Sequence, residues 1–227
     1  MKPEDIENKR YEQAEFNSIR AEERSLLRLL DSYSRERGIP YAKLKVLDIG
    51  CGSGRVTMEI VKRGCTVKGL EFSETALKYA RKRGLDVSYC NLDEGIPEPD
   101  GSYDVVWAGD IIEHVFDPMG VIKEVYRVLK DGGTFLFSIP SDVGLVSRVK
   151  MLLGISHQEE MYRRAGYYKH HTFFSPRLIQ FMLQQASLRI VVFEKILNLG
   201  ARQLRVRWLP SAFFNEMIIR ADKKAAA

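Results

Sequence analysis

Short runs of β-forming residues alternate with longer helix-forming runs over residues 44–140, and this alternation limits the possible folds more than any other feature of the chain. The runs that we expect to be strands are 45–50, 65–72, 85–90, 103–109 and 134–140. The expected helices lie between them, at 55–64, 73–84 and 117–133. Strands separated by helices form βαβ units, which assemble into a mostly parallel sheet with helices on both faces.

The segments on either side of this region extend the prediction. Residues 4–37 are polar and helix-prone, and a helix over 175–187 precedes expected strands over 188–197 and 212–222. Between 141 and 175 the alternation stops and the chain becomes basic and aromatic. We therefore expect a helical segment over 1–40 and an α/β domain over 41–227, in which 141–175 is an inserted cap over the site.

Composition argues against several classes of protein. The longest stretch without Asp, Glu, Lys or Arg is 178–188, which is too short to span a membrane, since a spanning helix needs about 20 apolar residues. The start of the chain is charged and lacks the apolar core of a secretory signal. The three cysteines have no CxxC spacing and suit neither a disulfide framework nor a zinc cluster, so we expect a reducing cytoplasm.

The charge of the chain is unevenly distributed. The formal net charge is +5, but residues 145–208 hold 11 Lys or Arg against 3 Asp or Glu. Such a basic stretch suits an acidic substrate, a nucleic acid or an anionic membrane surface, and it also suits a plain solvated face.

A glycine-rich turn follows the first expected strand, in the segment Asp48-Ile49-Gly50-Cys51-Gly52-Ser53-Gly54. Glycines at such a junction let a ligand approach the backbone, and the amino end of the next helix favours an anion. A dinucleotide site has the spacing G-x-G-x-x-G, whereas this turn has Arg55 in place of the third glycine. Asp48 would repel a pyrophosphate but suits an ammonium group. The alternative is a turn that uses glycine only for packing.

A carboxylate at the end of the second expected strand completes the pattern. Glu71 lies 21 residues after Gly50, where a carboxylate can accept hydrogen bonds from both hydroxyls of a ribose. The alternative for Glu71 is a solvent-facing place near a helix cap. A ribose, an ammonium group and a small anion, without a pyrophosphate, describe S-adenosylmethionine, which we expect as the cofactor.

The order of these motifs resembles that of the class I S-adenosylmethionine-dependent methyltransferases. The resemblance rests on VLDIGCGSGR at 46–55, LEFS at 70–73, the segment 88–118 with WAGDIIEHV, and EVYRVLKDGGTFLFSIPS at 124–141. It is greatest for the small-molecule branch that includes the ubiquinone-biosynthesis O-methyltransferases. The resemblance implies a Rossmann-like, seven-stranded, mostly parallel sheet whose last strand is antiparallel.

The resemblance also implies roles for individual residues. The methionyl part of the cofactor would be held by Asp48, Gly50, Cys51, Gly52, Ser53 and Gly54, and the ribose by Glu71. Phe72 would pack against the adenine, and Asn91 beside Leu92, or Asp93 in a displaced register, would bind the adenine amine. Gly109 and Asp110 would lie along the cofactor and face the acceptor.

Methyl transfer to a weakly acidic acceptor needs a group that removes a proton. His114 is the first candidate, because an unperturbed histidine titrates near neutral pH. His171 and its neighbour His170, from the expected cap, are the second. A structural role for the pair Glu113-His114 is the alternative. We expect no metal site, because no cysteine or carboxylate lies at ligand spacing from His170 and His171.

The expected acceptor is a small or lipid-like molecule, anionic or amphipathic, that is methylated at oxygen. After the fourth strand the chain reads Gly-Asp-Ile-Ile rather than the Asn/Asp-Pro-Pro-Tyr of base N-methyltransferases, which disfavours nucleic acid. The residues that could contact a ring or an anionic group are Tyr167, Tyr168, Arg202, Arg205, Arg207 and Trp208. We expect at most peripheral membrane contact. An RNA methyltransferase and a non-catalytic cofactor-binding protein are the alternatives.

Overall fold

The computed structural model describes residues 19–156, 159, 170–199, 202–205 and 214–225. In this part of the chain, strands form one sheet in the order β3-β2-β1-β4-β5-β8-β6-β7. The strands are β1 (Lys45–Ile49), β2 (Thr66–Glu71), β3 (Val87–Tyr89), β4 (Tyr103–Gly109), β5 (Leu129–Pro140), β6 (Leu188–Leu199), β7 (Arg202–Arg205) and β8 (Glu216–Lys223). The α-helices are α2 (Ala21–Arg37), α3 (Arg55–Lys62), α4 (Glu74–Lys82), α5 (Pro118–Val128), α6 (Leu145–Leu152) and α8 (Pro176–Gln185).

The strand directions confirm the predicted α/β, Rossmann-like class. β1 runs parallel to β2 and β4, β3 runs parallel to β2, and β5 runs parallel to β4. The last strand, β8, lies antiparallel between β5 and β6. The sheet has one strand more than the seven expected, because β7 folds back antiparallel on the end of β6. The sequence of β7, RQLR, has no apolar run, so the pattern there indicated a loop.

Two predicted boundaries between 41 and 227 differ from the structure by more than two residues. The helix expected over 117–133 ends at Val128, and Leu129 already pairs with Tyr103 of β4. Leu129 is fully buried in the core, which explains why the chain joins the sheet there. The last strand was expected over 212–222 and begins at Glu216, while residues 212–213 lie outside the described residues.

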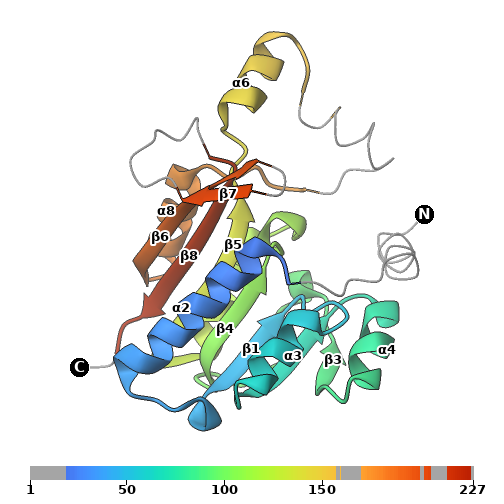
Figure 1. Ribbon diagram of the computed structural model, residues 1–227, viewed down its shortest axis with the longest axis vertical. Coiled ribbons are helices and arrows are strands. Elements are labelled where there is room, and N and C mark those ends of the chain that lie inside the picture. The colour runs from blue at the N-terminus through green and yellow to red at the C-terminus, as the bar shows by residue number, and fades with distance from the viewer. Residues whose placement is uncertain (1–18, 157–158, 160–169, 200–201, 206–213, 226–227) are drawn as a thin grey trace.

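Side chains of the central strands alternate between two cores, one on each face of the sheet. Val46 and Val105 contribute to a core with α2 and α3. Their neighbours Leu47 and Val106 contribute to the opposite core, with α5 and α8. Figure 1 shows α2 crossing the face of the sheet that is turned to the viewer. Because both faces are covered, a ligand must enter at an edge, where the parallel strands end.

The leading helix, α2, lies within the predicted range 4–37, of which residues 4–18 are outside the described part. Its apolar stripe is buried at Leu26, Leu30 and Tyr33, and the Tyr33 hydroxyl donates to the Gly132 carbonyl at 3.1 Å. The division of the chain at residue 40 stays a prediction. None of the described helices has both the length and the apolar content needed to cross a membrane.

The segment 141–175 leaves the sheet at the end of β5 and returns before α8. The amide of Asp142 donates to the Phe174 carbonyl at 3.0 Å, and the amide of Phe174 donates to Asp142 Oδ2 at 2.8 Å, so the two ends of the segment are joined. Between them, α6 projects away from the sheet (Figure 1). Its role as a cap stays a prediction, and Tyr167 and Tyr168 lie outside the described residues.

Candidate active site

The turn after β1 has the backbone that its glycines permit. Gly50, Gly52 and Gly54 have φ values of 71°, 57° and 78°. L-residues rarely adopt this left-handed conformation. A Cβ at Gly50 would overlap Ile111, and one at Gly54 would overlap Leu85. These two glycines therefore have a packing role, which sequence analysis gave as the alternative for the whole turn.

Gly52 has a further role, because its backbone amide binds the side chain of the last residue of β2. Its amide donates to Glu71 Oε2 at 2.8 Å, and the amide of Ser73 donates to Glu71 Oε1 at 2.7 Å. Glu71 ends β2 and is largely buried. The two amides fix both oxygens of this carboxylate at the edge of the sheet, where it can still accept hydrogen bonds from a ligand. Beside Gly52, Cys51 is buried and Ser53 is partly exposed.

Asp48 lies in β1 just before this turn and is 3% exposed. The Thr57 hydroxyl donates to its Oδ2 at 2.7 Å. Burial raises the pKa of Asp48 to about 7, and the nearby carboxylates of Glu23 and Glu71 act in the same direction, while Thr57 acts against them. Because Glu23 is paired with arginines, the carboxyl groups of Asp48 and Glu71 are the ones that favour a cationic ligand and disfavour a pyrophosphate.

The amino end of α2 is tied to this region by ion pairs that sequence analysis missed. Glu23 is 3% exposed and accepts hydrogen bonds from both terminal nitrogens of Arg55, at 2.6 and 2.5 Å. Arg20 Nε donates to Glu23 Oε1, which also accepts from Arg55, at 2.9 Å. A signal existed, because Glu23 lies three residues before Leu26, on the apolar stripe of α2.

Arg20 also reaches the turn after β4. Its terminal nitrogen lies 2.7 Å from Asp110 Oδ2, and the Ser138 hydroxyl donates to Asp110 Oδ1 at 2.5 Å. Asp110 follows Gly109 and has a φ of 54°, an uncommon value for a residue other than glycine. Both oxygens of Asp110 thus have protein partners, so its expected contact with the cofactor stays a prediction.

The expected adenine region lies beyond β2. The rings of Phe72 and Tyr89 have centroids 5.8 Å apart, which gives Phe72 an aromatic neighbour in β3. Asn91 Oδ1 accepts from the Asp93 amide at 3.2 Å, and Leu92 is partly buried against the core. Asp93 Oδ1 accepts from the amides of residues 116 and 117, at 2.8 and 3.1 Å. Asp93 therefore holds a neighbouring loop together, and the contact of Asn91 or Asp93 with the adenine amine stays a prediction.

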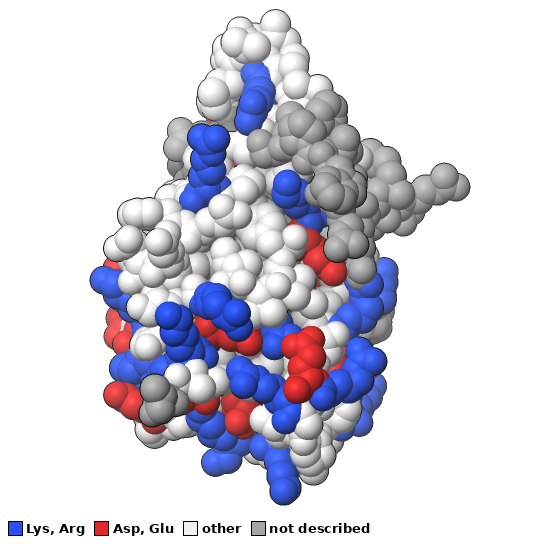
Figure 2. Space-filling model, turned by 90° about the vertical axis from the view of Figure 1, so that its left-hand side faces the viewer, with Lys and Arg blue, Asp and Glu red and all other residues white. Residues whose placement is uncertain are grey.

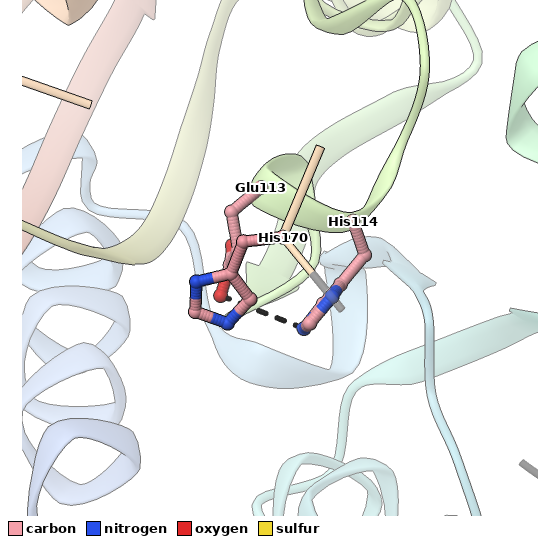
Figure 3. Close-up of side chains that lie close together, drawn as sticks. All are labelled: Glu113, His114 and His170. Carbon is pink, nitrogen blue, oxygen red and sulfur yellow. Dashed lines mark ion pairs between the residues drawn. The ribbon is translucent and has the colours of Figure 1, made fainter. Parts of the chain in front are cut away.

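Three polar side chains meet beside the end of β4, as Figure 3 shows. Glu113 and His114 belong to a short 3₁₀ helix, Ile112–His114, and His170 comes from the end of the segment 141–175. One ligand atom from each lies within 4.8 Å of the others. His114 Nε2 is 3.7 Å from Glu113 Oε1, and the rings of His114 and His170 meet edge to face with centroids 4.9 Å apart.

The other candidate base, His171, is placed differently. Its amide donates to the Glu113 carbonyl at 2.8 Å, and its ring lies 4.0 Å from the exposed ring of Phe116, centroid to centroid. The structure thus brings together both regions that were predicted to supply a base. It also supplies a carboxylate, Glu113, near His170, which residue spacing could not reveal. That the chain binds no metal stays a prediction, although Glu113, His114 and His170 together could act as metal ligands.

Glu216 is a second acidic residue that sequence analysis missed. It is the first residue of β8, which is antiparallel to β5, so it lies beside Pro140 at the carboxyl end of the parallel strands. It is 8% exposed, and its Oε1 has no hydrogen-bond partner among the described residues. Burial raises its pKa well above the ordinary value, as do the charges of Asp110 and Glu113. Sequence could not place Glu216 near Glu113, because its position depends on the direction of β8 in the sheet.

Residues 47–137 match a family model described as a methyltransferase domain, and they include the turn after β1, Glu71 and His114. The chain carries a methyltransferase domain. The family resemblance stated from the motifs is therefore confirmed, and the methyltransferase domain covers β1 to most of β5.

Curated relatives match the methyltransferase domain and part of its surroundings. The chain is 38% identical over 109 residues to a ubiquinone biosynthesis O-methyltransferase of Pseudomonas entomophila, covering 44% of this chain and 46% of that protein. It is 31% identical over 162 residues to a protein of the same name from Idiomarina loihiensis, covering 67% of this chain and 65% of that protein. The chain thus spans about half to two thirds of the length of these relatives.

Solved structures match over more of the chain. A methyltransferase of Thermotoga maritima, described as a possible histamine N-methyltransferase, superposes with a TM-score of 0.62 at 23% identity, over 89% of this chain and 97% of that one. A methyltransferase of Mesorhizobium loti superposes with a TM-score of 0.63 at 19% identity, over 85% and 96%. At these identities the likeness shows the fold, and the methyltransferase domain here shares it.

Proposed function

We propose that the chain binds S-adenosylmethionine and transfers its methyl group to an oxygen atom of a small-molecule acceptor. The observation that carries the proposal is the arrangement of Asp48, Gly52 and Glu71. In it, a buried carboxyl group and a carboxylate fixed by two backbone amides flank a glycine turn at one edge of the sheet.

The residues present suit this cofactor. Burial and the neighbouring Glu23 and Glu71 disfavour ionisation of Asp48, and the cofactor's ammonium group would stabilise its ionised form. Glu71 would accept hydrogen bonds from the ribose hydroxyls, since Gly52 and Ser73 already hold its two oxygens in place. S-adenosylmethionine, when bound, supplies a methyl group that its sulfonium activates. Alignment of the acceptor, exclusion of water and removal of a proton are left to the protein.

The proton acceptor in this proposal is His114. Its side chain is 25% exposed, and its Nε2 lies 3.7 Å from Oε1 of the buried Glu113. A histidine that gains a proton beside a carboxylate is stabilised in the charged form, as a general base requires. The alternatives are His170, whose ring meets that of His114 edge to face, and His171, whose amide binds the Glu113 carbonyl.

The acceptor is proposed to be anionic or amphipathic. The support is the basic composition of residues 145–208, from which Arg202 and Arg205 belong to β7 at the edge of the sheet. Arg207 and Trp208 lie outside the described residues. The names of the curated relatives agree with an acceptor of low molecular mass that is methylated at oxygen. A cytoplasmic site of action agrees with three free, buried cysteines.

Calorimetric titration with S-adenosylhomocysteine, with NAD as the control ligand, tests the proposed cofactor. Binding of the first alone supports it, whereas binding of neither would return Asp48 and Glu71 to structural roles. A screen of phenolic and lipid-linked acceptors, with transfer of labelled methyl groups as the readout, then tests the reaction. Cofactor binding without any labelled product would favour a non-catalytic binding protein. Labelled RNA, bound with a steep salt dependence, would favour the RNA methyltransferase.

A further inference from the structure

Four acidic side chains lie in a row along the carboxyl edge of the sheet, on the face that α2 covers. Asp48, Glu71 and Glu216 each lie an even number of residues from a side chain in the core beneath α2, so they share that face. Asp110, directly after β4, joins them through its ion pair with Arg20 of α2. In the order of the sheet the row runs from β2 through β1 and β4 to β8. The proposed cofactor needs only the first two members, Glu71 and Asp48, which leaves the end at β8 for the acceptor.

Glu216 is the unsatisfied member of this row. It is 8% exposed, and its Oε1 has no hydrogen-bond partner in the part of the chain that the structure describes. The charge of Arg20 favours its ionisation, but Arg20 already binds three other carboxylates, those of Glu22, Glu23 and Asp110. On the face that Figure 2 shows, red atoms lie beside blue ones, so acidic side chains there are close to cations. Carboxyl groups are seldom buried unless they are paired, and Glu216 therefore indicates a place for a ligand.

A second buried polar group lies at the same end of β5. Ser141 directly follows Pro140, the residue that pairs with Glu216, and its amide donates to the Asn215 carbonyl at 3.0 Å. Ser141 is 5% exposed, and its Oγ likewise has no hydrogen-bond partner among the described residues. Two unsatisfied polar groups on adjoining stretches of backbone make this corner of the site polar.

The charges around Glu216 select the sign of the ligand. Burial raises the pKa of Glu216 well above the ordinary value, and the nearby charges of Asp110 and Glu113 act in the same direction. A carboxylate or phosphate brought to this corner would meet the same repulsion from Asp110 and Glu113. A cation would be attracted to all three groups.

We infer that Glu216 binds an ammonium group of the methyl acceptor. The inference rests on the proposed methyl transfer, and it specifies the acceptor as an alcohol or phenol that also carries an amine. An ammonium group donates hydrogen bonds and accepts none, which suits a carboxylate oxygen that lacks a partner. The basic strand β7 is two strands away from β8, about 10 Å at the usual strand spacing. An anionic group on the same acceptor would therefore lie at the other end of the molecule.

Three phenols that differ in one group test the inference. Tyramine carries an ammonium group, 4-ethylphenol lacks it, and 4-hydroxyphenylacetate carries a carboxylate instead. Binding of each to the full-length protein is measured by ligand-observed NMR, with and without S-adenosylhomocysteine. We expect the wild type to bind tyramine about tenfold more tightly than 4-ethylphenol, and 4-hydroxyphenylacetate the most weakly, because a hydrogen bond between charged groups is stronger than one between neutral groups.

Two variants assign this preference to a residue. Glu216→Gln keeps the shape of the side chain and removes its charge, so it should bind tyramine and 4-ethylphenol about equally. The matched control is Asp131→Asn, at a side chain that is 54% exposed and lies beside Lys223, at the other end of β8. This control should keep the preference of the wild type for tyramine.

Two outcomes would overturn the inference. One is a wild type that does not prefer tyramine to 4-ethylphenol, which includes binding of neither compound. The other is a preference for tyramine that survives in Glu216→Gln. Failure of the proposed function gives a different result, since S-adenosylhomocysteine would then not bind, while the preference for tyramine and its loss in Glu216→Gln would remain. Circular dichroism checks the fold of the variant, and the comparison of the three phenols on the wild type tests the inference even if Glu216→Gln unfolds.

Discussion

The amide of Gly52 donates a hydrogen bond of 2.8 Å to Oε2 of Glu71, so the glycine turn after β1 and the end of β2 form one rigid unit. This contact gives each residue a dual role. Gly52 keeps the backbone open to a ligand and also holds the carboxylate that would bind the ribose. A change at either residue should therefore affect ligand binding before it affects folding.

Substitution Glu71→Gln should weaken binding of S-adenosylhomocysteine by about 2 kcal/mol, or roughly 30-fold, because hydrogen bonds to a charged acceptor are worth more than those to a neutral one. Calorimetry measures the change. Glu74→Gln, at an exposed side chain three residues later, is the matched control and should bind as the wild type does. Equal affinities in wild type and Glu71→Gln would remove the ribose assignment.

Binding of S-adenosylhomocysteine should weaken as the pH falls below 7. Burial raises the pKa of Asp48 to about 7, so below that pH the folded protein holds a proton that the ligand's ammonium group must displace. We expect roughly tenfold weaker binding per pH unit below 7. Titrations at several pH values measure this, and Asp48→Asn should bind weakly at all of them. An affinity that is constant across this pH range would show that Asp48 does not bind the ligand's ammonium group.

The same pKa shift predicts a change in stability. Because the pKa of Asp48 in the folded protein lies above the value of about 3.9 in an unfolded chain, the folded state binds more protons between about pH 4 and 7. The stability that depends on this proton is complete below pH 4 and is lost as the pH rises through 7. Asp48→Asn should therefore unfold at a higher urea concentration than the wild type at pH 8. A lower midpoint would show that the ionised carboxylate is itself stabilising.

Loss of the ion pairs at the amino end of α2 should be costly. Glu23 is 3% exposed and binds Arg20 and Arg55, so Glu23→Gln leaves the largely buried Arg55 and the more exposed Arg20 with a neutral partner. We expect a loss of about 3 kcal/mol in the free energy of unfolding. Urea titration measures it, with Glu59→Gln, from an exposed ion pair with Lys62, as the control that should lose less than about 1 kcal/mol.

If His114 is the catalytic base, its substitution should lower turnover and leave cofactor binding nearly unchanged. His114→Ala should lower the turnover number by about a hundredfold and leave the affinity for S-adenosylhomocysteine within about twofold of the wild type. His171→Ala is the comparison. The His171 ring lies against that of Phe116, and its amide donates to the Glu113 carbonyl. Unchanged turnover in His114→Ala with loss in His171→Ala would move the base to His171.

If a metal binds at Glu113, His114 and His170, elemental analysis of purified protein will find it in a stoichiometric amount, contrary to our expectation.

The sequence by itself determined the fold class and the elements of the candidate cofactor site. The alternation of short and long runs requires a parallel sheet covered on both faces, because a strand and a helix each bury their apolar residues with a fixed period. Asp48, the glycine turn and Glu71 could be placed from sequence because each lies at the end of a strand or directly after it. The edges of parallel strands coincide, so these residues had to meet.

Only the tertiary structure decided which distant groups complete the site. Arg20 meets Asp110, and His170 meets Glu113 and His114, across long separations in sequence that no local period encodes. Glu216 reaches the same edge because β8 runs antiparallel and begins where the other strands end. The eighth strand, β7, forms by pairing with β6 and has no apolar run of its own to indicate it. Such contacts depend on strand order and direction, which side-chain periodicity does not specify.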